Sequence, residues 1–229
     1  MSAKWMGFGI LMLAAGFAVG RLSSFPASVE EARSPASFQQ ALAERDPLQR
    51  WFGVSRYLQG LSPEELPDAV TVLQAEPRRL RFDELRAFML AWARFDPHHA
   101  LEQALAWPTA DRRRASGAAM FAYAFYQPEA ASRMLARQRE GKPRDFLQER
   151  MVEGWAASGR LGELDAYLAS LPEGERRNTL VSLLAREVAR DGSQALLRWR
   201  DGFPSEPPSL RQFVVQQVRA IQAAAPAPR

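Results

Sequence analysis

The chain has 229 residues, of which 47% are hydrophobic, enough for a substantial core in one elongated domain or two small ones. It contains no cysteine, which excludes disulfide bonds and thiolate metal sites. The formal net charge is +4, but Lys4 and Arg21 flank the first apolar segment, and without them the chain carries +2, short of the imbalance typical of strong nucleic-acid binding. Helix-forming residues dominate and β-branched residues are sparse, which predicts an all-α protein.

An uncharged stretch runs from Trp5 to Gly20 at the N-terminus. As a helix it rises about 24 Å, somewhat less than the ~30 Å of a hydrocarbon core. The flanking cations can reach the membrane surface and extend the span. We therefore expect an uncleaved signal anchor, a transmembrane helix over residues 1–22. A cleaved signal peptide ending near Gly20 is the alternative.

Cations ahead of this span favour a cytoplasmic N-terminus. The sequence thus predicts a single-pass protein of a bacterial inner membrane with the bulk of the chain in the periplasm, or a protein secreted to the periplasm if the signal is cleaved. Residues 23–37 are rich in Ser, Pro and Ala and are expected to form a tether. Residues 223–229 are expected to be a disordered tail, which leaves 38–222 as a helical-repeat domain.

Four later stretches resemble one another, because each opens with a bulky residue and Ala and continues to a polar residue before Pro or Gly. They begin at Trp92, Tyr123, Trp155 and Val188. Their breaks, at Asp96-Pro97, Gln127-Pro128, Ser158-Gly159 and Asp191-Gly192, lie 31, 31 and 33 residues apart. A period of this length fits two short antiparallel helices and their turns.

The period divides the chain into helix pairs. Apolar residues at i, i+3, i+4 and i+7 support the helices, as in the run from Leu85 to Trp92. In the second helix of the first unit, Ser62 and Glu65 predict a capping box with Pro63 as the first helical residue. The aromatic run from Met120 to Tyr126 is either covered on both sides or places one aromatic in a groove. The units are expected near 47–77, 78–108, 109–140, 141–172 and 173–204, followed by an amphipathic capping helix from about Ser209 to Gln222.

The stretches WAASGRLGELDAYLASLPEGE and WARFDPHHALEQALAWP resemble divergent units of the tetratricopeptide-like helical-repeat superfamily, over roughly residues 47–204. The period is shorter than that family's and the usual Gly-x-x-Tyr spacing is missing, which leaves room for another helical-repeat class with a different curvature. The resemblance implies a right-handed α-solenoid of about five helix pairs with a terminal capping helix and a groove for partner proteins or peptides. It carries over no catalytic residue.

His98 and His99 are the only histidines. Adjacent residues point about 100° apart on a helix, so these two do not readily share a metal ion. The chain has no Gly-x-Ser-x-Gly elbow, P-loop or Gly-rich dinucleotide turn. We therefore expect no catalysis, metal, cofactor or small-molecule substrate.

Basic residues recur just before the expected first helix of each unit. Cations at a helix N-terminus oppose the macrodipole at a cost of about 0.3–1 kcal/mol each, so stability alone does not favour them. One interpretation is a binding edge that faces anionic lipid or an acidic partner. The other is a solvated edge neutralised by nearby carboxylates. The candidate edge consists of Arg79, Arg81, Arg112, Arg113, Lys142, Arg144, Arg176 and Arg177.

The sequence therefore predicts a membrane-anchored, non-catalytic scaffold or adaptor that binds other proteins through the groove of a helical repeat. One alternative is an accessory helical-repeat protein beside an envelope enzyme that acts on peptidoglycan or another glycan. A second is a nucleic-acid-binding helical repeat, against which the apparent secretion signal argues.

Overall fold

The computed structural model describes residues 37–75 and 80–224. The expected signal anchor, most of the tether, the end of the tail and Arg79 lie outside the described residues. Within them the chain forms twelve helices and no strand, which confirms the all-α prediction. The helices are α2 (Phe38–Ala43), α3 (Pro47–Gly60), α4 (Leu66–Ala75), α5 (Phe82–Ala93), α6 (Pro97–Ala106), α7 (Thr109–Tyr126), α8 (Pro128–Ala136), α9 (Lys142–Ala157), α10 (Leu161–Ser170), α11 (Glu175–Ala189), α12 (Ser193–Gly202) and α13 (Pro208–Ala224).

Each expected unit contains two of these helices, and local turn chemistry explains where they break. Pro97 and Pro128 each stand at the first position of a helix, where a missing N–H costs nothing. Gly159 and Gly192 have φ of +78° and +96°, a backbone conformation that disfavours residues with a Cβ. The breaks chosen from the sequence therefore fall at the turns between the first and second helices.

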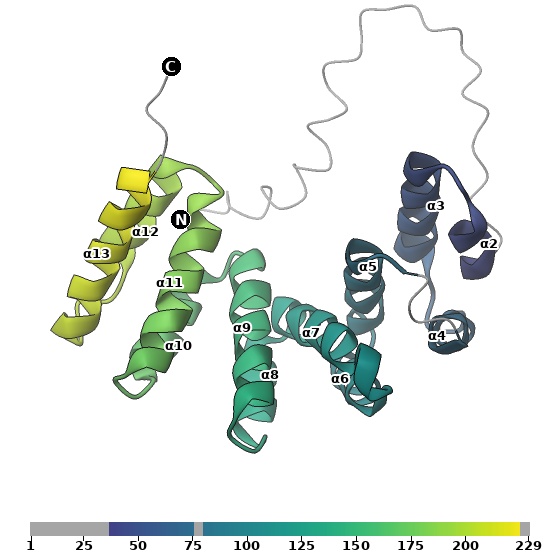
Figure 1. The fold of residues 1–229 in the computed structure, drawn as a ribbon, viewed down its shortest axis with the longest axis horizontal. Coiled ribbons are helices and arrows are strands. Elements are labelled where there is room, and N and C mark those ends of the chain that lie inside the picture. Colours follow the sequence, from purple (N-terminus) through teal and green to yellow (C-terminus); the bar gives the residue numbers. More distant parts are fainter. Residues whose placement is uncertain (1–36, 76–79, 225–229) are drawn as a thin grey trace, which may run out of the picture.

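The first helices of successive units pack against one another in the order α3, α5, α7, α9, α11 and α13. Figure 1 shows these helices side by side in a curved row, with the second helices beside them along the row. From α5 to α11, each first helix also contacts the second helix of its own unit. Neighbouring units therefore share one continuous hydrophobic core.

The middle of this row is covered most completely. On α7, the residues from Ala118 to Ala124 are all buried, because α5, α6, α8 and α9 surround the helix. Tyr126, at its end, is 39% exposed. Most residues of the aromatic run from Met120 to Tyr126 are therefore covered by neighbouring helices, which is the first of the two interpretations.

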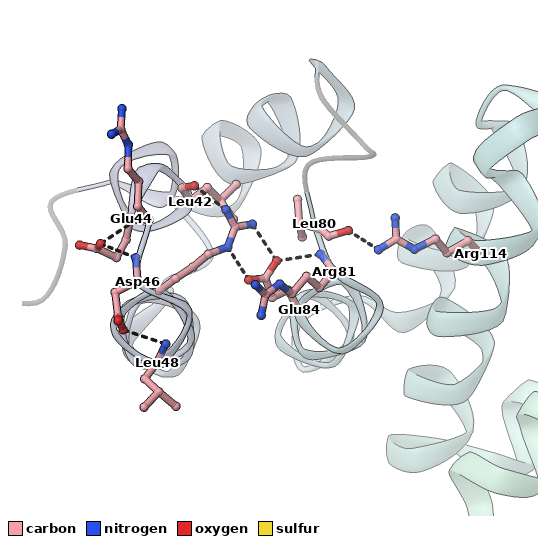
Figure 2. A network of polar contacts seen from close by, with 10 residues as sticks. Leu42, Glu44, Asp46, Leu48, Leu80, Arg81, Glu84 and Arg114 are labelled. Carbon is pink, nitrogen blue, oxygen red and sulfur yellow. Dashed lines mark hydrogen bonds and ion pairs between the residues drawn. The ribbon is translucent and has the colours of Figure 1, made fainter.

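The helix α2 was not expected from the sequence. Phe38 anchors it, because this buried ring packs on Tyr57 at 5.5 Å and on Phe88 at 5.2 Å between ring centroids. Arg50 adds a polar tie from α3, donating two hydrogen bonds to the buried Glu84 of α5 at 2.6 and 2.8 Å and one to the Leu42 carbonyl of α2 at 2.7 Å (Figure 2). These contacts join α2, α3 and α5 into one body.

The predicted capping box at Ser62 is present, but the helix begins later than expected. The Glu65 carboxylate accepts from the Ser62 N–H at 3.0 Å, and the Ser62 hydroxyl accepts from the Glu65 N–H at 3.3 Å. The helix α4 itself starts at Leu66, because Pro67 has no N–H to donate to the Pro63 carbonyl. Pro63 therefore lies in the preceding turn.

The last helix, α13, extends two residues beyond its expected end, to Ala224. Its buried face carries Leu210, Val214 and Val218, which pack on α11 and α12. The opposite face is exposed, in agreement with the amphipathic pattern expected of a terminal helix.

Candidate binding surface

Arginine and phenylalanine side chains meet across three successive first helices. The Arg86 guanidinium of α5 lies over the Phe121 ring of α7, 3.5 Å from its centroid. The Arg113 guanidinium of α7 lies over the Phe146 ring of α9 at 4.2 Å, and Arg150 approaches the same ring at 5.5 Å. We refer to these five residues as the Arg–Phe surface.

Helical spacing places these residues on one face. On α7, Arg113, Gly117, Phe121 and Phe125 follow one another at intervals of four residues, so they form one stripe. On α9, Phe146 and Arg150 have the same interval. The packing of α7 on α9 and the contact of Arg113 with Phe146 place the two stripes next to each other.

Two glycines allow α7 and α9 to approach closely enough for these contacts. A Cβ on Gly154 would overlap the Phe121 carbonyl oxygen and lie 2.9 Å from its carbonyl carbon. A Cβ on Gly117 would lie 2.7 Å from Cζ of Phe146. The Phe146 ring therefore occupies the space that a side chain at Gly117 would need, and it lies within reach of Arg113.

The Arg86 guanidinium is partly desolvated, whereas Arg113 is exposed. Burial lowers the pKa of Arg86, opposed by the charges of Glu153 and Glu187 and assisted by those of Arg150 and Arg190. Within the described part of the chain, neither Arg86 nor Arg113 has an ion pair. Arg86 is therefore a half-buried cation that feels the charges of Glu153 and Glu187 but has no ion pair with them.

Arg150 is only partly satisfied. It forms an ion pair with Glu153 at 2.7 Å, one turn further along α9. Its Nε is buried and has no hydrogen-bond partner among the described residues. Burial raises the pKa of Glu153 and the charge of Glu187 on α11 raises it too, whereas Arg150 and Arg86 lower it. The charged part of the surface thus reaches from α5 to α11.

A separate open groove of about 610 Å³ lies between α11 and α13, close to the volume range of small-ligand pockets. Most of its lining residues are of polar type, and Phe213 is the large apolar residue among them. The lining residues are Glu173, Gly174, Glu175, Asn178, Thr179, Ser182, Arg186 and Phe213.

The structure corrects the placement of the candidate basic edge. Most of its described members lie inside the first turns of α7, α9 and α11, because these helices begin earlier than the sequence indicated. Only Arg81 precedes its helix, as the N-cap residue of α5, and its N–H donates to Glu84 at 2.8 Å. Lys142 is the exposed first residue of α9.

Several members of the edge are engaged within the chain. Arg112 donates to the Trp107 carbonyl at 3.0 Å, and Arg144 to Glu140 at 3.2 Å. Arg176 donates to Gln148 at 2.8 Å and to Glu149 at 2.9 Å, and it also donates to the Asp145 carbonyl.

Arg177, only 4% exposed, lies 3.6 Å from Glu173. The described part of the edge is therefore not brought together as one free row. Arg113 is the predicted residue that lies on the Arg–Phe surface.

The two histidines lie apart from this surface chemistry. Asp96 caps α6 by accepting from the backbone N–H of His99 at 2.9 Å, and the His99 ring packs on Trp92. His98 Nδ1 lies 3.6 Å from Glu102 Oε2, a pair at i, i+4 that the sequence prediction overlooked. Among the described residues no third His, Asp or Glu joins them in a potential metal site.

Four residues of the Arg–Phe surface were not singled out from the sequence: Arg86, Phe121, Phe146 and Arg150. The available signal was the alternation of Arg and Phe at corresponding positions of neighbouring first helices, 33 and 35 residues apart. That signal becomes visible only once the first helices are known to stack on one another.

Comparison with known proteins yields no match: no family model, curated protein or solved structure is similar to this chain. None of the helices in residues 37–75 and 80–224 is long and apolar enough to cross a membrane.

Proposed function

We propose that this protein is a membrane-anchored, right-handed α-solenoid of about five helix pairs that binds other proteins as a scaffold or adaptor. Trp5 to Gly20 would hold it in a bacterial inner membrane, with the helix pairs in the periplasm. No catalytic residue, cofactor or small-molecule substrate is part of the proposal. The continuous row of first helices supports the solenoid, because each unit buries its apolar face against the next.

The single observation that carries the binding function is the Arg–Phe surface. Protein interfaces are enriched in Arg and aromatic side chains, and the residues that dominate binding energy are drawn from the same types. Here the guanidiniums lie on rigid helices and are already stacked on rings. Little side-chain ordering is then needed on association, which favours affinity.

Site-specific photocrosslinking in cells tests the proposal. The photoreactive residue p-benzoylphenylalanine replaces Phe125, which continues the α7 stripe beyond Phe121. The matched control places it at Arg198, an exposed residue on the second helix α12. We expect a discrete protein adduct from position 125 and none from position 198. Equal adducts from both positions, or none from either, would refute binding at this surface.

Reporter fusions after Gln222 test the location. A reporter that is active only in the periplasm should be active in this fusion, and one active only in the cytoplasm should be inactive. The reverse pattern would contradict the anchor and its orientation.

A further inference from the structure

We infer that the Arg–Phe surface receives an acidic protein segment, whose carboxylates bind the guanidiniums of Arg86 and Arg113. This inference rests on the proposed function and specifies the chemistry of the partner. It follows from the arrangement of four side chains: each of the two cations lies on a phenylalanine ring of the next helix.

Stacking fixes how these cations present their donors. A guanidinium is planar, and its N–H groups point outward in the plane of the group. A guanidinium whose flat face lies over a ring keeps its donating edges directed away from that ring. Such an edge matches the two oxygens of a carboxylate, which it binds through paired hydrogen bonds.

The surroundings of the two arginines favour an added anion. Neither guanidinium has an ion pair within the described residues, and Arg86 is half-buried. A partly desolvated cation without a close counterion gains more from a carboxylate than one in bulk water does. The neighbouring Arg150 adds a third positive charge, although Glu153 offsets it in part.

The same surface is poorly suited to a nucleic acid. Single-stranded chains bind by stacking bases on accessible aromatic faces. Phe121 is only 4% exposed and lies beneath Arg86, so this face is already covered. Glu153 and Glu187 lie near the arginines and would repel a continuous phosphate backbone. An acidic peptide can instead place separate carboxylates at the two cations.

Fluorescence anisotropy on the full chain in uncharged detergent tests the inference. The probes are fluorescein-labelled octaglutamate and octaglutamine, compared at low and at moderate salt. We expect the wild-type protein to bind octaglutamate at least tenfold more tightly than octaglutamine. The double variant Arg86→Ala, Arg113→Ala should lose at least tenfold in affinity for octaglutamate, and Arg198→Ala should bind as the wild type does.

Two further variants separate a binding role from a structural one. Arg113 is exposed, so Arg113→Ala alone should leave the circular dichroism melting curve unchanged while it weakens octaglutamate binding several-fold. The double lysine variant, Arg86→Lys with Arg113→Lys, keeps both charges but loses the planar edge, and it should bind with intermediate affinity.

The inference fails if octaglutamate binds the double alanine variant as it binds the wild type. It also fails if a short single-stranded RNA, octauridylate, binds the protein more tightly than octaglutamate does and depends on the same arginines. Crosslinks from position 125 without any preference for octaglutamate would overturn the acidic partner and leave the proposed function standing. If there are no crosslinks from position 125 and no preference for octaglutamate, both the acidic partner and the proposed function are overturned.

Discussion

Asp165 offers a sharp test of how burial controls charge in this fold. The residue lies on α10, is 4% exposed and accepts one hydrogen bond, from Trp199 Nε1 of α12 at 2.9 Å. Burial raises the pKa of this carboxyl from an ordinary 3.8 to about 6, although the bond from Trp199 acts in the opposite direction. The folded protein therefore holds a proton here more firmly than the unfolded chain does.

The sign and size of the effect follow from linkage. A carboxyl whose pKa is raised on folding stabilises the fold while it is protonated, and this contribution is lost as pH rises from about 4 to about 6. A shift of this size corresponds to about 3 kcal/mol at most, since one pKa unit is worth ~1.4 kcal/mol. Asp165→Asn removes the charge and keeps an oxygen that can accept from Trp199. A new buried N–H₂ group costs about 1–3 kcal/mol if it finds no partner.

The assay is urea unfolding followed by circular dichroism at several pH values between 4 and 8. We expect the free energy of unfolding of Asp165→Asn, relative to the wild type, to rise by about 2–3 kcal/mol between pH 4 and pH 7. Asp191→Asn is the matched control, because it removes an exposed carboxylate. A difference between Asp165→Asn and the wild type that stays constant with pH would show that burial does not keep this carboxyl neutral.

Three further changes test the packing. Gly154→Ala should lower the free energy of unfolding by more than about 2 kcal/mol, because the added Cβ meets the Phe121 backbone. Gly162 has open space around it, so Gly162→Ala should raise the free energy of unfolding by about 0.5–1 kcal/mol. Thermal melts distinguish the two variants. Glu84→Gln should cost about 3 kcal/mol by breaking the tie to Arg50, and a double-mutant cycle with Arg50→Met should show strong coupling. Asp46→Ala should cost about 1 kcal/mol, seen in urea melts, because the Asp46 carboxylate accepts from the N–H groups of Leu48 and Gln49 (Figure 2).

The helix pairs could be predicted because their boundaries depend on local chemistry. Pro97 and Gly159 both lie at the turn inside a unit, so the 62 positions that separate them span two periods. The six-residue helix α2 could not be predicted, because it depends on contacts of Phe38 with Tyr57 and Phe88, which lie 19 and 50 positions later in the sequence. The Arg–Phe surface is of the second kind, because its two closest pairs, Arg86 with Phe121 and Arg113 with Phe146, each join two helices.

Glu84 shows why a charge pattern alone does not reveal which charged residues join the units. Burial raises the pKa of this carboxyl, but the hydrogen bonds from the Arg50 side chain and the Arg81 backbone together outweigh that effect, and its pKa lies below the ordinary value. In sequence, Glu84 is one acidic residue at a helix start, like several others. Only its partner from α3, 34 residues earlier, gives it a structural role.

The recurrence of arginine along the chain has a structural cause that the sequence alone did not show. Several arginines donate to main-chain carbonyls of a neighbouring helix or unit, where the backbone would otherwise have an acceptor facing the packing interface. The donor and carbonyl pairs are Arg50 with Leu42, Arg94 with Leu58, Arg114 with Leu80, Arg176 with Asp145, and Arg211 with Phe203.

A cation near a helix N-terminus costs about 0.3–1 kcal/mol, because it opposes the helix macrodipole. The hydrogen bonds to carbonyls offset this cost. Arg114 and Arg176 show this, because each lies near the start of its helix and donates to the preceding unit. A recurring basic residue is therefore not by itself a sign of a binding edge. Arg86 and Arg113 differ from these residues, because their guanidiniums contact rings and form no hydrogen bond or ion pair with a carbonyl or carboxylate of the described residues. This difference between arginines that join units and arginines that lie on phenylalanine rings is why we propose that the second group binds a partner.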